Sequence, residues 1–207
     1  MSSTASPYGL RAVNEIGGLP YAGSTRTFLI DPAGTAANIY NGSPVYVNTS
    51  GYLAVATATG ADATTNGFPV GTANTGIVGI FVGCSFVNAQ GQQIFSQYYP
   101  TGVTGVITAQ VIDDPDVVFQ VQSAGTCTQA VLGANVFFST GAVATGSTTT
   151  GNSTASVVAG ASAVTTTAAF RVVGFPQNVN STVGDAYTDL LVKINPGYHS
   201  YTNAVGL

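Results

Sequence analysis

Short segments of apolar residues, divided by Gly, Pro and Asn turns, recur along most of the 207-residue chain. Residues 105–113 and 116–122 alternate with a period of two, which predicts strands with one buried face. Residues 76–88 form a near-continuous apolar run, which fits a strand buried on both faces. The other segments that predict strands are residues 27–31, 38–48, 52–58, 93–99, 135–139, 170–175 and 187–194. Short strands at this spacing predict an all-β fold, namely an antiparallel sandwich or barrel that is jelly-roll-like.

Turn signals between these segments predict which strands pair locally. An Ala-Gln-Gly turn at 89–91 joins residues 76–88 to 93–99 and predicts a hairpin. The Asp-Asp-Pro-Asp turn at 113–116 predicts a second hairpin between the two alternating segments. Outside these strands, the sequence predicts one helical turn at residues 128–133. It also predicts two loops rich in Gly, Thr, Ala and Ser, at residues 58–71 and 140–169, the second of which contains a candidate edge strand at 156–159.

The chain divides into an extended N-terminal arm of residues 1–25, a β domain of residues 26–195 and a C-terminal tail of residues 196–207. Gly and Pro interrupt any helical period in the arm. The arm nevertheless carries more large apolar side chains than a solvated tail usually holds. Two readings stay open: the arm packs on its own domain, or it lies across a neighbouring subunit. For the second reading, the candidate capsid or inter-subunit contacts are Tyr8, Leu10, Arg11, Val13, Ile16, Tyr21 and Arg26.

Charge is scarce throughout the sequence. Charged residues make up 6% of the chain, against about 25% in a typical soluble domain. The polar surface is instead supplied by residues such as Gly and Thr, of which there are 26 and 28. The net charge is −4 with only 4 Lys and Arg, which argues against nucleic-acid binding because a polyanion requires many cations. The alternatives are a secreted protein of low charge, or a subunit whose uncharged polar faces become interfaces.

Targeting signals are not evident in the sequence. The first 18 residues lack the basic start and apolar stretch of a signal peptide. No run reaches the roughly 18 apolar residues of a membrane helix. We therefore expect synthesis in a cytoplasm and no membrane partner.

Few residues offer catalytic or metal-binding chemistry. His199 is the single histidine and lies among aromatic residues in the predicted tail, a setting more typical of packing than of general-base catalysis. The acids of residues 113–116 share one turn, which normally exposes them to water; a calcium site is the alternative to a plain hairpin turn. Cys84 and Cys127 are far apart in sequence and predict buried free thiols, with a disulfide only if their strands meet. We expect no enzyme, no cofactor and no His or Cys metal site.

The few cations predict local ion pairs. Arg171 and Lys193 lie within apolar segments, where a cation often pairs with a carboxylate or faces a partner. Asp185 and Asp189 are near enough in sequence to serve them.

Three segments together resemble the head decoration (cement) proteins and related small structural proteins of tailed bacteriophages. They are SPYGLRAVNEIGGLPYAGSTR (6–26), DDPDVVFQVQSAGTCTQAVLGANV (113–136) and FRVVGFPQNVNSTVGDAYTDLLVKINPGYHSY (170–201). The resemblance implies a virion protein on the outer capsid surface, commonly a trimer at local three-fold positions, whose partner is the major capsid protein. It marks no individual binding residue.

The leading hypothesis is therefore a capsid-stabilising structural protein that clamps neighbouring major capsid subunits. The alternative is a module on the virion that binds glycans or a host surface. For that alternative, the candidate aromatic residues are Tyr98, Tyr99, Tyr198 and Tyr201.

Overall fold

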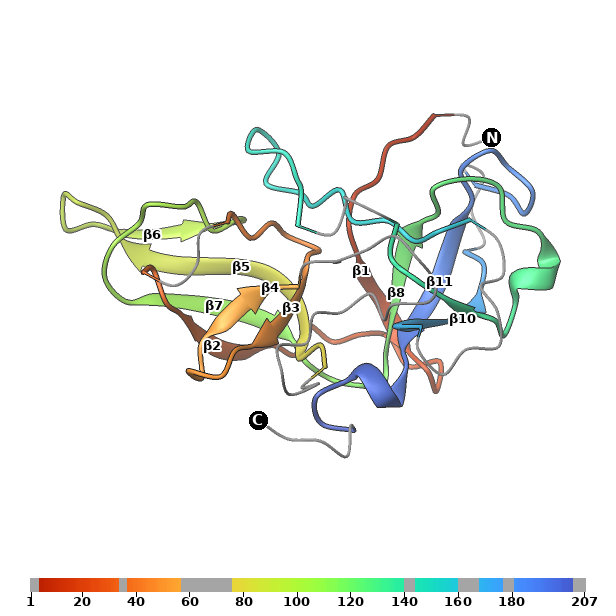
Figure 1. Ribbon diagram of the computed structural model, residues 1–207, viewed down its shortest axis with the longest axis horizontal. Coiled ribbons are helices and arrows are strands. Elements are labelled where there is room, and N and C mark those ends of the chain that lie inside the picture. The colour runs from red at the N-terminus through yellow and green to blue at the C-terminus, as the bar shows by residue number, and fades with distance from the viewer. Residues whose placement is uncertain are drawn as a thin grey trace.

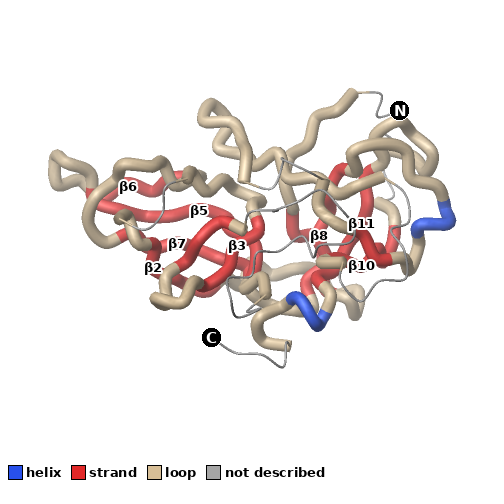
Figure 2. Tube along the Cα trace, viewed as in Figure 1, coloured by secondary structure: helices blue, strands red, loops and turns tan. Residues whose placement is uncertain are grey.

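A computed structural model describes residues 4–33, 37–56, 76–139, 144–159, 168–176 and 181–202. These residues form two antiparallel sheets and two short 3-10 helices, η1 (Gln129–Val131) and η2 (Pro196–Tyr198), with no α-helix among them. Figure 1 shows the six-stranded sheet at the left and the five-stranded sheet at the right, and Figure 2 shows how much of the chain between them is loop. The prediction of an all-β fold with antiparallel sheets is confirmed, and the arrangement is consistent with a sandwich.

The five-stranded sheet joins segments that are far apart in the sequence. Its order is β1 (Arg11–Glu15), β8 (Val117–Gln122), β11 (Asp189–Ile194), β10 (Phe170–Gly174) and β9 (Asn135–Val136). β11 is the central strand of this order and buries every second side chain, whereas the neighbouring β8 is buried at all positions but Gln120. Both strands therefore contribute to the core.

The six-stranded sheet contains the most apolar strand. Its order is β2 (Arg26–Ile30), β7 (Ile107–Ile112), β5 (Gly79–Val87), β3 (Pro44–Val47) and β4 (Leu53–Val55), with β6 (Gln93–Ser96) also paired to β5. β5 and β6 form the hairpin that the sequence predicts. β2 and β4 end this order, yet they also contact one another, so the sheet curls toward a barrel.

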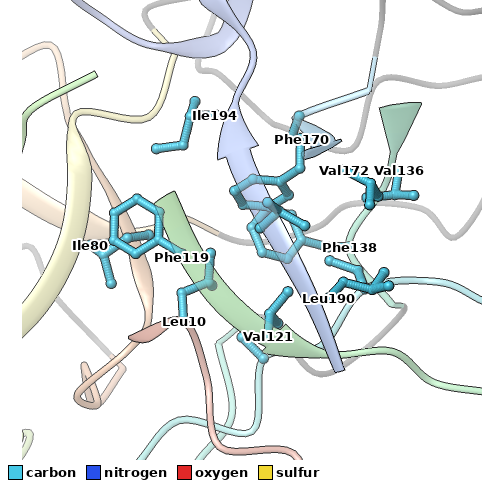
Figure 3. Close-up of a cluster of buried hydrophobic side chains, with 14 of the residues drawn as sticks. Leu10, Ile80, Phe119, Val121, Val136, Phe138, Phe170, Val172, Leu190 and Ile194 are labelled. Carbon is cyan, nitrogen blue, oxygen red and sulfur yellow. The ribbon is translucent and has the colours of Figure 1, made fainter. Parts of the chain in front are cut away.

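Two clusters of buried side chains make up the core. One lies within the six-stranded sheet and includes Phe81 and Tyr99. The other centres on the five-stranded sheet, where Phe138 and Phe170 meet edge to face with ring centroids 4.7 Å apart. Figure 3 shows that Ile80 of β5 joins this second cluster, so the two sheets share a boundary core.

The turn at 113–116 does not form the predicted hairpin. β7 belongs to the six-stranded sheet and β8 to the five-stranded sheet, so the turn carries the chain from one sheet to the other. Two strands that alternate with a period of two look the same in sequence whether they pair or turn a corner. The hairpin prediction was therefore wrong for a reason that local pattern cannot reveal.

The predicted extended arm is not confirmed. Residues Arg11–Glu15 form β1, which pairs with β8, and Leu10 is buried in the core. The Leu10 N–H donates to Gly42 O over 3.0 Å. A Cβ added to Gly9 would lie 3.0 Å from the Gly42 backbone, and a Cβ added to Gly42 would lie 3.0 Å from Leu10 N. The close approach of these two backbone segments therefore needs glycine at both positions. In the described residues, the segment packs on its own domain.

The described part of the predicted C-terminal tail, residues 196–202, also packs on the domain. His199 is completely buried, and the segment runs beside Ile77, whose N–H donates to Tyr198 O. The predicted helical turn at 128–133 is confirmed as η1. The loop predicted at 58–71 and parts of the stretch at 140–169 lie outside the described residues. Where the structure describes the chain, no helix is long and apolar enough to cross a membrane.

Candidate interaction surface

Some of the seven predicted contact residues hold the N-terminal segment in place. Leu10 is a core residue. The Tyr8 hydroxyl is buried, and burial together with the nearby Asp189 carboxylate raises the pKa of Tyr8 above its usual value. The Arg11 guanidinium lies over the Tyr8 ring, 4.7 Å from its centroid. Tyr8 and Leu10 therefore anchor the segment and leave little of themselves for a partner.

Other predicted contacts remain on the surface. Val13 and Ile16 are 45% and 51% exposed, and neighbouring Leu19 is 65% exposed. Ile16 and Leu19 lie on a turn in which Glu15 N–H donates to Leu19 O. We call Val13, Ile16 and Leu19 the β1 patch. The sequence placed these residues in the candidate segment but could not separate them from the buried anchors, because the spacing of the apolar residues follows no regular period.

Arg26 and Tyr21 lie near the crossover between the two sheets. Arg26 Nε lies 2.8 Å from Asp113 Oδ2, and the Tyr201 hydroxyl donates to the same oxygen over 2.7 Å. The Arg26 guanidinium also lies over the Tyr201 ring. Burial raises the pKa of Tyr21, and the carboxylates of Asp113 and Asp114 raise it further. We call Arg26, Asp113 and Tyr201 the clasp, since they join β2, the end of β7 and the C-terminal segment.

The acids of the crossover are engaged within the protein. Asp113 belongs to the clasp, Asp114 Oδ1 accepts the Asp116 N–H over 2.8 Å, and Asp116 Oδ1 lies 2.6 Å from Lys193 Nζ. Within the described ranges, no group of three or more His, Cys, Asp or Glu side chains could hold a metal ion. The calcium alternative therefore gains no support from this turn.

The cations pair differently from the prediction. Lys193 pairs with Asp116, which is 77 positions away, and Arg171 Nε donates to Asn135 Oδ1 over 3.1 Å. Asp189 instead accepts a hydrogen bond from Gln120. Asp185 Oδ2 accepts the backbone N–H of Thr182. Sequence proximity was a poor guide because the strands that meet are distant in the chain.

His199 and the two thiols are buried. The ring of His199 lies beside that of Tyr201, and its Nδ1 accepts the Tyr201 N–H over 3.2 Å. Burial lowers the pKa of His199, although nearby Asp113 opposes this shift. Cys84 and Cys127 are both free and buried, in separate core clusters, as expected. His199 is therefore packed in the interior beside Tyr201.

The four tyrosines proposed for glycan binding do not form one exposed cluster. Tyr99 is fully buried, while Tyr98 stacks on Tyr40 with ring centroids 5.6 Å apart. Tyr198 packs against the core of the five-stranded sheet, and Tyr201 is occupied in the clasp. Of the four, only Tyr201 is an exposed large side chain.

A second set of exposed apolar residues was not predicted from the sequence. Phe95 and Val106 are 81% and 74% exposed, and Val87 and Leu29 are also exposed. Leu29, Val87 and Phe95 belong to β2, β5 and β6, and Val106 immediately precedes β7. The available signal was the alternation within residues 93–96, which separates Phe95 from buried-side Ile94.

Comparison with known proteins gives no relative. No family description, curated protein or solved structure matched this chain.

Proposed function

We propose that this chain is a non-enzymatic structural protein of a tailed-phage virion that binds the outer surface of the capsid. In this proposal it is synthesised in the host cytoplasm, becomes a homotrimer on the shell and clamps neighbouring major capsid subunits there. The observation that carries the proposal is the β1 patch, in which three large apolar side chains stand exposed on a segment anchored by Leu10. The resemblance of three segments to capsid decoration proteins supplies the identity of the partner.

The physical basis of the proposed binding is burial of apolar surface on a firm support. Exposed apolar side chains in one segment mark a protein-binding site more often than scattered ones do. β1 is held by pairing with β8 and by the Tyr8 and Leu10 anchors, so little ordering entropy is lost when a partner covers the patch. Many copies on one shell add their individual affinities through multivalency.

Binding to shells that lack this chain tests the proposal. We expect wild-type protein to co-sediment with such shells, and the double variant Ile16→Ser, Leu19→Ser to bind at least about tenfold more weakly. The matched control is Leu132→Ser, because Leu132 is also exposed but lies beside η1 at a distance in sequence. Wild-type protein that does not bind shells would refute the proposal.

A different result would favour the alternative. A glycan array that gives a hit for the wild-type protein, with loss of that hit in Tyr201→Ala, would point to a glycan-binding module. Under the capsid proposal, we expect no reproducible hit.

A further inference from the structure

The six-stranded sheet is nearly free of charge. Between Asp31 and Asp113 the sequence contains a single charged residue, Asp62, which lies outside the described residues. Strands β3 to β7 carry no charged side chain, and β2 carries only Arg26, at its first position. In a soluble monomer, charges on such a surface normally oppose self-association. Here that barrier is missing on one sheet.

The strand register places the exposed apolar residues on one face of this sheet. Phe95 pairs with Ser85, Ser85 with Thr108, and Thr108 with Leu29, so these four side chains form one row across β6, β5, β7 and β2. Residues directly opposite in antiparallel strands point to the same side. The neighbouring residues along each strand, such as Ala109 next to Thr108, point to the other side of the sheet and are buried in the core. The row through Phe95 therefore lies on the outer face.

A second row lies beside the first. Gln93 pairs with Val87, and continuing the register past Phe86 and Ile107 places Val106 next to Val87. Continuing the β2–β7 register in the same way places Asp31 beside Val106. We call these two rows together the outer face.

Each row has a similar order of polar and apolar groups when read from either end. The first row runs from an aromatic group through two hydroxyls to an aliphatic group. The second runs from a polar group through two valines to a polar group. A two-fold axis parallel to the strands, through the middle of the rows, therefore sets apolar against apolar and hydroxyl against hydroxyl. Under this axis, Phe95 of one copy meets Leu29 of the other, and Asp31 meets Gln93 rather than a second Asp31.

We propose that the outer face binds a second copy of this chain, face to face, about a two-fold axis parallel to the strands. This inference stands apart from the capsid proposal, since it involves a different surface from the β1 patch. Like-charge repulsion does not oppose the contact, because Asp31 is the one charged residue of the two rows and lies at a corner.

The expected affinity follows from the size of the face. Four strands about 4.8 Å apart and two side-chain rows about 6.8 Å apart cover roughly 260 Å² per copy. A standard specific interface covers about 800 Å² per partner. We therefore expect a weak dimer, with a dissociation constant in roughly the micromolar range or above.

Sedimentation velocity on the purified full chain, from about 1 μM to about 1 mM, tests this pairing. We expect a concentration-dependent monomer–dimer equilibrium, weakened at least about tenfold by Phe95→Ser, because Phe95 is the most exposed apolar group of the outer face and aromatic groups carry much of such an interface. Phe95 is exposed, so its replacement leaves the core intact. Leu132→Ser, which removes an exposed apolar group elsewhere, should leave the equilibrium unchanged.

Cross-linking with a short bismaleimide tests the direction of the axis. A mixture of Gln93→Cys and Asp31→Cys proteins should cross-link, whereas Gln93→Cys alone should not, because its two copies lie about 14 Å apart along the row. Native Cys84 and Cys127 are buried and should not react. The proposal is overturned by a wild-type protein that stays monomeric at about 1 mM, by association insensitive to Phe95→Ser, or by a trimer that Phe95→Ser dissolves.

Discussion

The Asp113 carboxylate should contribute far more to stability than the Asp116 carboxylate, although each pairs with one cation. The Asp113 side chain is 12% exposed and accepts from both Arg26 and the Tyr201 hydroxyl. The Asp116 side chain is 61% exposed and meets only Lys193 among the contacts described above. An exposed ion pair contributes about 0–1 kcal/mol, whereas a buried acceptor left without proper partners loses more.

The magnitude for Asp113→Asn follows from these two bonds. The bond to Tyr201 contributes about 1–1.5 kcal/mol, at the low end for a charged acceptor because the tyrosine is half exposed. The Arg26 pair adds about 0.5–1 kcal/mol, since the arginine side chain is 63% exposed. The sum is about 2 kcal/mol, which lowers Tm by roughly 4–8 °C in a chain of this size.

Thermal unfolding followed by circular dichroism measures this difference. We expect Asp113→Asn to lower Tm by the amount above, and the matched variant Asp116→Asn to change it by less than about 2 °C. A double-mutant cycle between Asp113→Asn and Tyr201→Phe should give a coupling of about 1 kcal/mol. Equal Tm values for the two Asp variants would refute the reasoning that links burial at the clasp to stability.

Three further predictions concern groups buried in the core. Because burial lowers the pKa of His199, the unfolded chain binds more protons than the native protein as the pH falls below about 6.5, so the free energy of unfolding should fall there. Chemical denaturation at several pH values should show this pH dependence in the wild-type protein and a weaker one in His199→Gln. Gly79→Ala should lower stability by about 3 kcal/mol or more in urea unfolding, because its Cβ would lie 2.1 Å from Ile112 O, whereas Gly17→Ala meets nothing within 4 Å and should be near neutral. Burial raises the pKa of Cys84 to about 12, so this thiol should resist iodoacetamide at pH 8 in the native protein and react once the chain is unfolded. Mass spectrometry would detect the modification, and rapid labelling of Cys84 in the native protein would contradict its burial.

The sequence predicted local features well and distant ones poorly. The β5–β6 hairpin followed from an apolar run, a Gly-containing turn and a second strand, all within a short stretch. Pairing of Lys193 with Asp116 depended on β11 lying beside β8, which no local pattern encodes. The β7–β8 turn failed for the same reason, since strand identity is local but sheet membership is not.

The candidate surfaces show the same division. Composition left two alternatives, a secreted protein of low charge or a subunit with uncharged interfaces, and the N-terminal segment was singled out as unusually apolar for a tail. Whether Leu10 or Leu19 is the exposed residue depends on the close approach to Gly42, a tertiary contact. The exposed row through Phe95 became visible only once three strand registers were known.

The pairing of β1 with β8 has a kinetic consequence. The Ser6 N–H donates to a Gln122 oxygen 116 positions away, so closing this contact spans more than half of the chain. Folds dominated by such distant pairings fold slowly, in milliseconds to seconds. β1 can dock only onto a β8 that has already formed, so we expect the β1 patch to be among the last surfaces to become ordered. A partner that binds this patch would then stabilise the final folding step, and assembly itself would help to complete the native fold.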